Sequence, residues 1–316
     1  MSQKTLLRTD RASRRKLSSA LIVLLAAALP LTACSSSSEE EASTSSATRE
    51  FTDVHGTTEV PENPQRVVVL EPLELDTAIA LGITPVGAAV ANNVTGIPAY
   101  LGVDGIEPVG TVSEPNIEAI AALEPDLILG TDSRHAEIYD RLESIAPTVF
   151  MTTHVDPWKD NVVFIGDALG KKQESEDLIQ GFNDKCEEIK SEHDVEGKTV
   201  NMIRPRDEQT MSLYGPTSFA GSSLECAGLT IPDQEWKDGL QADIAPENFM
   251  LATADYVFVT ATDVTDENEL PEVIRENREQ FPSLTLVDTS YWVSGVGPLG
   301  GSKVLEDIDA FLDAQQ

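Results

Sequence analysis

Residues 158–193, near the middle of the chain, limit the fold more than any other part of the sequence. Apolar residues at helical spacing predict a first helix that ends at Gly170, a natural left-handed C-terminal cap. The same spacing predicts a second helix over residues 173–193, apolar on one face and charged elsewhere. About twenty helical residues span roughly 30 Å, the width of a small domain. Because short apolar strands alternate with amphipathic helices on both sides, we expect this helix to join two α/β lobes with a cleft between them.

The first 33 residues have the features of a secretory signal: a basic stretch, an apolar run and a small-residue exit. The apolar run is too short for a mature transmembrane helix. Leu31-Thr32-Ala33-Cys34 resembles the bacterial lipobox, which predicts that Cys34 is acylated and becomes the mature N-terminus. An ordinary signal peptide with an incidental cysteine is the alternative. Ser13-Arg14-Arg15 leaves twin-arginine export open beside general secretion.

The mature chain is strongly acidic. The sequence has 22 Lys and Arg against 54 Asp and Glu, and the 6 basic and 1 acidic residues before Cys34 leave 16 against 53. A net charge of about −37 disfavours contact with nucleic acid and with anionic lipid head groups. We therefore expect no nucleic-acid partner, and we expect covalent lipid to hold the protein to the membrane.

The rest of the chain divides into three predicted parts after the signal. Residues 34–50, rich in serine and glutamate, are predicted to be a flexible tether. Residues 51–157 are predicted to form an N-terminal lobe and residues 194–316 a C-terminal lobe, with the helical segment 158–193 between them. The continuous apolar run Arg66–Leu70 is typical of a strand buried on both faces, which favours parallel sheets.

Two cysteines besides Cys34, Cys186 and Cys226, lie on predicted apolar helix faces. A disulfide is permitted outside the cytoplasm, and two buried thiols are an equal alternative. The four histidines, at 55, 135, 154 and 193, have no metal-ligand spacing, so we predict no metal site and no intrinsic cofactor.

Six segments of the chain resemble the bacterial ferric-siderophore substrate-binding proteins of ABC importers, in that family's order and spacing. They are RVVVLEPLELDTAIALGITPVGA, VGTVSEPNIEAIAALEPDLILG, IAPTVF, WKDNVVFIGDALGKK, LYGPTSFAGSSLE and YWVSGVGPLGGSKVLEDI. The resemblance covers nearly all of residues 59–313. It implies two Rossmann-like lobes joined by a single long interdomain helix, the class III arrangement. It also implies a monomeric lipoprotein on the extracellular face of the cell membrane that passes a ferric siderophore to a permease.

A ferric siderophore supplies its own oxygen ligands to the iron, so the protein needs cationic and aromatic side chains rather than metal ligands. Arg134 follows a predicted strand, in a position where the family places ligand contacts. Arg204 and Arg206 follow the first strand of the second lobe, on the same side of an extended segment. We predict that these three arginines bind the ligand; exposed loop arginines or ion-pair partners are the alternatives.

Tyr214, at a strand end, and Trp292, in a loop that reaches the cleft in relatives, complete the predicted site. A place in the core is the alternative for both, and Tyr291 is expected to be a core residue. Trp236, His135 and Glu71 are weaker candidates. An acid such as Glu71 would repel an anionic ligand, and a single histidine is more often a structural residue.

Resemblance to the family also implies docking to the permease through one glutamate at the outer end of each lobe. The matching residues are Glu118 and Glu247, each in the first turn of a predicted helix. The alternative is that each carboxylate only complements the helix dipole.

The family resemblance leaves the chelate open among catecholate, carboxylate, hydroxamate and mixed types. Hydroxamate-binding relatives commonly have an arginine where this chain has Val112, which disfavours a hydroxamate. Haem or cobalamin on the same scaffold is the first alternative, with His135 and Tyr214 as axial haem ligands. A surface-anchored hydrolase that uses Ser218 is a distant one, because no GxSxG sequence is present.

Overall fold

The computed structural model describes residues 47–92, 96–154, 157–237 and 239–316, and Ser45–Gln316 form one compact unit. The predicted signal peptide, Cys34 and most of the predicted tether lie outside the described residues. Strand β1 begins at Thr48, inside the segment that the sequence assigns to the tether. No helix in the described part of the chain is long and apolar enough to cross a membrane.

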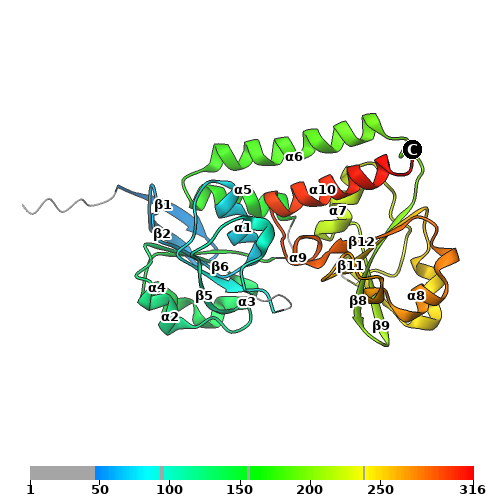
Figure 1. The fold of residues 1–316 in the computed structure, drawn as a ribbon. Helices are drawn as coiled ribbons and strands as arrows, with labels where there is room; N and C mark the ends of the chain where they lie inside the picture. Colours follow the sequence, from blue (N-terminus) through cyan, green and yellow to red (C-terminus); the bar gives the residue numbers. More distant parts are fainter. Residues whose placement is uncertain (1–46, 93–95, 155–156, 238) are drawn as a thin grey trace, which may run out of the picture. The chain divides into compact units, whose positions relative to one another are not determined.

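The first sheet, called the N-terminal sheet below, has five parallel strands in the order β5-β4-β3-β6-β7. Two of them, β5 and β6, are labelled in Figure 1. The strands are β3 (Val67–Val69), β4 (Gly87–Val90), β5 (Glu107–Thr111), β6 (Leu127–Thr131) and β7 (Thr148–Met151). The helical elements between them are α1 (Pro72–Ala80), η1 (Ala99–Leu101), α2 (Ile117–Ala122), α3 (Asp132–His135), η2 (Ala136–Ile138) and α4 (Tyr139–Glu143). β3 is buried along its whole length, as its continuous apolar sequence predicts.

A hairpin that the sequence analysis did not predict precedes this sheet. It consists of β1 (Thr48–Asp53) and β2 (Gly56–Pro61), paired antiparallel. The Asp53 carboxylate accepts a hydrogen bond from the Phe150 N–H of β7 at 2.7 Å, and the His55 ring stacks on Tyr139 at 3.7 Å. These contacts attach the hairpin to the N-terminal sheet.

The second sheet, the C-terminal sheet, has the order β10-β9-β8-β11-β12. Its strands are β8 (Val200–Asp207), β9 (Thr210–Tyr214), β10 (Gln241–Ile244), β11 (Tyr256–Ala261) and β12 (Leu284–Asp288). β8, β11 and β12 are parallel to one another. Toward the β10 edge of the sheet, β9 runs antiparallel to both β8 and β10. Its helical elements are α7 (Phe219–Cys226), η3 (Pro246–Ala252), η4 (Glu267–Glu269), α8 (Glu272–Glu276), η5 (Arg278–Gln280) and α9 (Thr289–Trp292).

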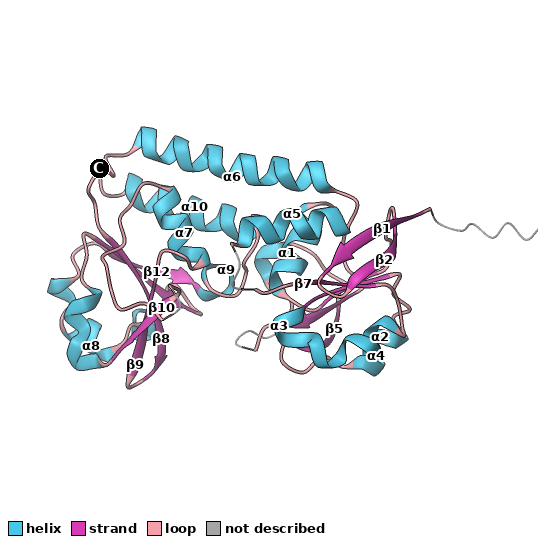
Figure 2. Cartoon of the chain, turned by 180° about the vertical axis from the view of Figure 1, so that it is seen from behind, coloured by secondary structure: helices cyan, strands magenta, loops and turns pink. Residues whose placement is uncertain are grey.

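The predicted pair of central helices is confirmed as α5 (Trp158–Ala168) and α6 (Lys172–Glu192), with Gly170 between them at φ 72°. Figures 1 and 2 show α6 side by side with the last helix, α10 (Pro298–Asp313). Asp309 of α10 joins the two helices, because its carboxylate accepts from Lys185 Nζ at 2.8 Å and contacts His193 Nε2 at 2.7 Å. α10 begins five residues before the predicted start at Lys303.

A disulfide joins Cys186 of α6 to Cys226 of α7, with 5.5 Å between the Cα atoms. This finding decides between the two states that the sequence left open. Next to the bond, the Trp158 ring packs edge-on against Phe182 and Phe219. The long helix is therefore attached to the C-terminal sheet's helices by a covalent bond and by aromatic packing.

The N-terminus of α10 is held by Asp76 of α1. One carboxylate oxygen of Asp76 accepts from the Leu299 N–H and the other from the Gly300 N–H, both at 2.8 Å. The Tyr100 hydroxyl donates to the second oxygen at 2.8 Å. A Cβ on Gly297, at φ +148°, would come within 2.5 Å of this carboxylate, so the approach requires glycine. The last helix is thus tied at its start to the N-terminal side of the fold.

Candidate functional site

The described residues line a cavity of about 330 Å³ between the two sheets, partly open to solvent and called the interlobe cavity below. It is lined from both sides of the fold. The lining residues are Glu71, Pro72, Leu73, Ala91, Asn92, Val112, Ser113, Arg134, His154, Arg204, Val293, Ser294 and Val296.

After the carboxyl end of each of the five strands of the N-terminal sheet, one residue lines this cavity. Glu71 follows β3, Asn92 follows β4, Ser113 follows β5, Arg134 follows β6 and His154 follows β7. In open parallel sheets the carboxyl ends lie along one edge, where ligands bind. The parallel topology therefore brings together side chains that are up to 83 residues apart in the sequence.

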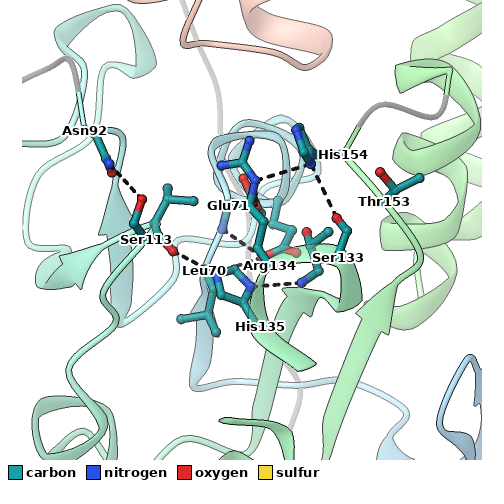
Figure 3. A network of polar contacts seen from close by, with 12 residues as sticks. Leu70, Glu71, Asn92, Ser113, Ser133, Arg134, His135, Thr153 and His154 are labelled. Carbon is teal, nitrogen blue, oxygen red and sulfur yellow. Dashed lines mark hydrogen bonds and ion pairs between the residues drawn. The ribbon is translucent and has the colours of Figure 1, made fainter. Parts of the chain in front are cut away.

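Arg134 is braced by two neighbours (Figure 3). Its Nε atom lies 3.3 Å from Glu71 Oε1 and donates to His154 Nδ1 at 3.2 Å. Within the described ranges, no hydrogen-bond partner is found for the two terminal nitrogens of Arg134. The guanidinium group is thus positioned through Nε, and its four terminal N–H bonds are not used by the described residues.

Burial shifts the pKa values of the acidic residues and the histidine around Arg134. Glu71 is 3 % exposed, and burial raises the pKa of its carboxyl to about 7, against the opposing effect of the Arg134 charge. Burial, together with the neighbouring Glu71 charge, raises the pKa of Glu74 well above its usual value. Burial and the Arg134 charge lower the pKa of His154 to about 4. His154 is therefore neutral at pH 7, and because Nδ1 accepts from Arg134, the proton is on Nε2.

The C-terminal sheet contributes Arg204, at the point where β8 passes beyond its pairing with β11. Arg204 Nη1 donates to the Tyr214 hydroxyl of β9 at 3.1 Å. Tyr214 is half-buried and reaches the cavity only through this arginine. Arg204 therefore lines the cavity, whereas Tyr214 supports this arginine from the neighbouring strand; ligand binding by these two residues stays a prediction.

Arg206 lies outside the interlobe cavity, contrary to the prediction. Its Nε donates to Ser212 Oγ at 2.8 Å and its Nη2 to Gln241 Oε1 at 2.8 Å. Ser212 and Tyr214 share one face of β9, so Arg204 and Arg206 are on the same side, as alternation predicts. Arg206 is two residues further along the strand, roughly 6.6 Å, and lies beside a separate surface hollow.

Trp292 is a core residue, so its predicted place in the site is wrong. Its side chain is 1 % exposed and stacks on Phe258 with 4.9 Å between ring centroids. Its Nε1 donates to Asp307 Oδ2 at 2.8 Å. The helical turn α9 directs this ring inward, where the sequence predicted a loop. Tyr291, predicted to be in the core, is half-buried and donates to the same carboxylate oxygen at 2.9 Å.

The weaker candidates have structural contacts. His135 is 2 % exposed; its Nδ1 accepts from the Thr131 N–H at 3.1 Å and its Nε2 donates to the Val112 carbonyl at 2.9 Å. Neither ring nitrogen is left to bind haem. Trp236 does not line the cavity and packs beside Gly215. Ser218 is the N-cap of α7 and donates to the Gly215 carbonyl at 2.7 Å.

Within the described residues, one group has the geometry to share a metal ion: Glu192, His193 and Asp309. Asp309 is already paired with Lys185 and His193, which indicates a structural link between α6 and α10. This group is separate from the interlobe cavity.

The two docking candidates are both exposed. Glu118, in the first turn of α2, has a side chain that is 88 % exposed and 4.0 Å from Arg141 Nη2. Glu247 is exposed in the first turn of η3, a 3-10 element where the sequence predicted a helix.

Sequence reasoning did not single out Asn92, Ser113, His154 or Ser294 as site residues. Asn92 Nδ2 donates to Ser113 Oγ at 2.7 Å on one wall of the cavity (Figure 3). Asn92, Ser113 and His154 follow the carboxyl ends of β4, β5 and β7. That position was the signal in the sequence that could have identified them.

A family model described as periplasmic binding protein matches residues 67–280. The probable siderophore-binding lipoprotein YfiY of Bacillus subtilis (strain 168) is 37 % identical over 195 residues, which cover 60 % of each chain. The Fe(3+)-citrate-binding protein YfmC of the same organism is 31 % identical over 223 residues, covering 69 % of this chain and 70 % of YfmC. The structure of Staphylococcus aureus SirA complexed with staphyloferrin B has a TM-score of 0.67 at 26 % identity, covering 84 % of this chain and 99 % of SirA.

This chain belongs to the periplasmic binding protein family, a class of solute-binding proteins. Its fold is the predicted one, two α/β lobes joined by a long helix, as in the class III siderophore-binding proteins. The chain spans about 60 % of the length of the curated relative YfiY and half of YhfQ, a putative ABC transporter substrate-binding lipoprotein of the same organism.

Proposed function

We propose that this chain is a lipid-anchored solute-binding protein on the outer face of the cell membrane. It captures a ferric siderophore and delivers it to the permease of an ABC importer. The observation that carries this proposal is the interlobe cavity, which receives one arginine from each sheet, Arg134 and Arg204. Two guanidinium groups complement an anionic chelate that supplies its own ligands to the iron.

The named relatives support this ligand class. YfiY is described as siderophore-binding, YfmC as binding Fe(3+)-citrate, and SirA was solved with staphyloferrin B. Cys34 is the proposed site of lipidation, and the protein is proposed to act as a monomer. It is proposed not to be an enzyme, in keeping with the capping role of the Ser218 hydroxyl.

Titration of the purified protein without residues 1–34 tests ligand capture, with intrinsic tryptophan fluorescence as the signal. The panel contains ferric siderophores of each chelate type, their iron-free forms, haem and cobalamin. We expect quenching by an anionic ferric chelate at sub-micromolar concentration and none by its iron-free form. A response to haem or cobalamin alone would contradict the ligand and leave the fold unaffected.

Delivery to the permease is tested by combining Glu118→Ala with Glu247→Ala. Both carboxylates are exposed and outside the cavity, so ligand affinity should be unchanged while iron uptake by cells falls. Glu137→Ala, which removes another exposed glutamate of the N-terminal side, is the matched control. Loss of ligand binding in the double variant would show that the docking assignment is wrong.

A further inference from the structure

We propose that Asp76 is a positioning residue for ligand capture: its carboxylate holds residues 293–297, which form one wall of the interlobe cavity, in place relative to the opposite wall. Residues 293–297 are called the wall segment below. This inference rests on the proposed function, because it concerns the cavity in which the ferric chelate is proposed to bind. Three observations lead to it: the place of the wall segment in the cavity, the contacts between Asp76 and α10, and the position of Asp76 on α1.

The wall segment connects α9 to α10 and contributes Val293, Ser294 and Val296 to the lining of the cavity. The N–H groups of Val293 and Ser294 both donate to the Thr289 carbonyl of α9 at 3.2 Å. These two hydrogen bonds attach the beginning of the segment to α9. The position of its other end depends on what holds the start of α10.

Asp76 completes the first turn of α10 from outside that helix. The N-cap residue of α10 is Gly297, which has no side chain to cap the helix, and Pro298 at the first helical position has no N–H. The next two N–H groups, of Leu299 and Gly300, both donate to the Asp76 carboxylate at 2.8 Å. Asp76 thus takes the role of an N-cap side chain, and a negative charge is favourable at this end of the helix dipole.

The wall segment lies directly against Asp76 and against the Tyr100 side chain of η1. A Cβ on Gly295 would overlap the Tyr100 hydroxyl, and a Cβ on Gly297 would overlap the Asp76 carboxylate. The Tyr100 hydroxyl donates to Asp76, and the Tyr100 ring packs edge-on against Tyr291 with 5.7 Å between centroids. Asp76 itself is fully buried. The backbone of the segment is therefore supported by these two side chains, and a shorter residue at position 76 would remove part of that support.

The helix that carries Asp76 also forms part of the opposite wall. Glu71, the N-cap of α1, lines the cavity and braces Arg134, and Pro72 in the first turn of α1 lines the cavity as well. Pro72 and Asp76 are four residues apart, so they lie on one face of α1. About one turn of a single helix therefore connects the group around Arg134 to the wall segment.

Loss of the Asp76 carboxylate would leave the N–H groups of Leu299 and Gly300 without this acceptor. The start of α10 would fray, and the wall segment would sample several positions in the free protein. A chelate that binds to one of these positions must order the segment, and the cost of ordering weakens affinity. This effect needs no contact between Asp76 and the chelate, since Asp76 is not among the residues that line the cavity.

Fluorescence titration of Asp76→Ala tests the inference. The probes are ferric citrate, a ferric tris-catecholate, a ferric trihydroxamate and a ferric chelate of mixed type. For the probe that binds the unaltered protein most tightly, we expect affinity to fall about tenfold in Asp76→Ala. The loss should be about threefold in Asp76→Asn, because asparagine keeps one of the two acceptor oxygens. Ser218→Ala, which removes the N-cap of α7 outside the cavity, is the matched control and should bind the probe like the unaltered protein.

Hydrogen exchange followed by mass spectrometry separates this role from a general loss of stability. In Asp76→Asn without chelate, exchange should rise in peptides that cover residues 293–301, and the bound probe should reverse part of that rise. Unchanged affinity of Asp76→Ala and Asp76→Asn, with circular dichroism spectra that match the unaltered protein, would overturn the inference and leave the proposed function standing. Failure of all four probes to bind the unaltered protein would overturn both, so the two failures are distinguishable.

Discussion

The two sheets each deliver an arginine to the same cavity, but they hold it in different ways. All five strands of the N-terminal sheet are parallel, so their carboxyl ends supply Glu71 and His154 as neighbours that brace Arg134. The C-terminal sheet has antiparallel strands at one edge, and these place Tyr214 beside Arg204 instead. A parallel sheet gathers several loop residues at one edge, whereas an antiparallel edge supports a residue from the neighbouring strand.

The largest expected effect is a loss of stability when the disulfide between α6 and α7 is removed. Replacing both Cys186 and Cys226 with serine removes the bond between α6 and α7. The free energy of unfolding should fall by about 2–4 kcal/mol, because the unfolded chain loses a cross-link. Urea denaturation of the two proteins measures the difference.

Ligand affinity should change little in this variant, because neither cysteine lines the cavity. Reducing agent provides the control, since it should destabilise the unaltered protein and leave the double variant unaffected. An unchanged urea midpoint would show that noncovalent contacts, such as the aromatic packing around Trp158 and the link from Asp309 to Lys185, are sufficient to hold the long helix.

The next largest effects are the losses of ligand affinity expected when either arginine of the cavity is replaced. Arg134→Ala should reduce affinity for the ferric chelate about 30-fold to 100-fold, since hydrogen bonds to a charged group contribute about 1.5–3 kcal/mol and Glu71 loses its partner. Arg204→Ala should reduce affinity for the ferric chelate about tenfold, because the guanidinium group of Arg204 is braced by one neighbour rather than two. Fluorescence titration at pH 7 compares them.

Arg134→Lys separates charge from geometry, because an ammonium group keeps the charge and cannot form the bidentate contact. Its affinity should lie between those of the unaltered protein and Arg134→Ala. Equal losses for Arg134→Ala and Arg204→Ala would mean that bracing by Glu71 and His154 adds nothing to binding.

A smaller change in ligand affinity is expected with pH, and we expect it to come from Glu71, on the N-terminal side of the cavity. The pKa of Glu71 is raised to about 7, so its charge disappears as the pH falls through that value. The loss of a negative charge beside Arg134 strengthens binding of an anion, and we expect affinity at pH 6 to exceed that at pH 8 by about fivefold.

The groups that face Glu71 are Arg134, His154 and the buried Glu74. With its pKa lowered to about 4, His154 stays neutral between pH 6 and pH 8. Glu71→Gln should therefore remove the part of the pH dependence that Glu71 causes, and comparison with the unaltered protein at each pH cancels changes in the chelate itself. A persistent fivefold change in Glu71→Gln would assign the effect to another group.

The smallest effect should come from Tyr214→Phe, which removes the hydroxyl that accepts from Arg204 and keeps the ring. A hydrogen bond of this kind contributes about 0.5–1.5 kcal/mol, so affinity should fall about threefold. The same titration measures it, and Tyr256→Phe, a half-buried tyrosine outside the cavity lining, is the control. A loss as large as that of Arg204→Ala would indicate that the hydroxyl contacts the ligand directly.

Local patterns in the sequence were sufficient for much of the fold. The central helices, the cap at Gly170 and the buried strand β3 follow from spacing and continuous apolar runs, which depend on near neighbours in the chain. The hairpin of β1 and β2 was missed, because its polar sequence is stabilised by contacts such as Asp53 with Phe150, 97 residues away.

By itself, the sequence determined the central helices, the buried strand β3 and the positions of Arg134 and Arg204 near strand ends, since these depend on local spacing. It predicted Arg134 and Arg204 as ligand-binding residues, and both line the cavity. Only the tertiary structure decided which side chains meet there. It buried Trp292 against Phe258, turned Arg206 toward Ser212 and Gln241, and brought Glu71 and His154 to Arg134. The physical reason is that burial and pairing depend on packing between distant segments, which no local pattern records.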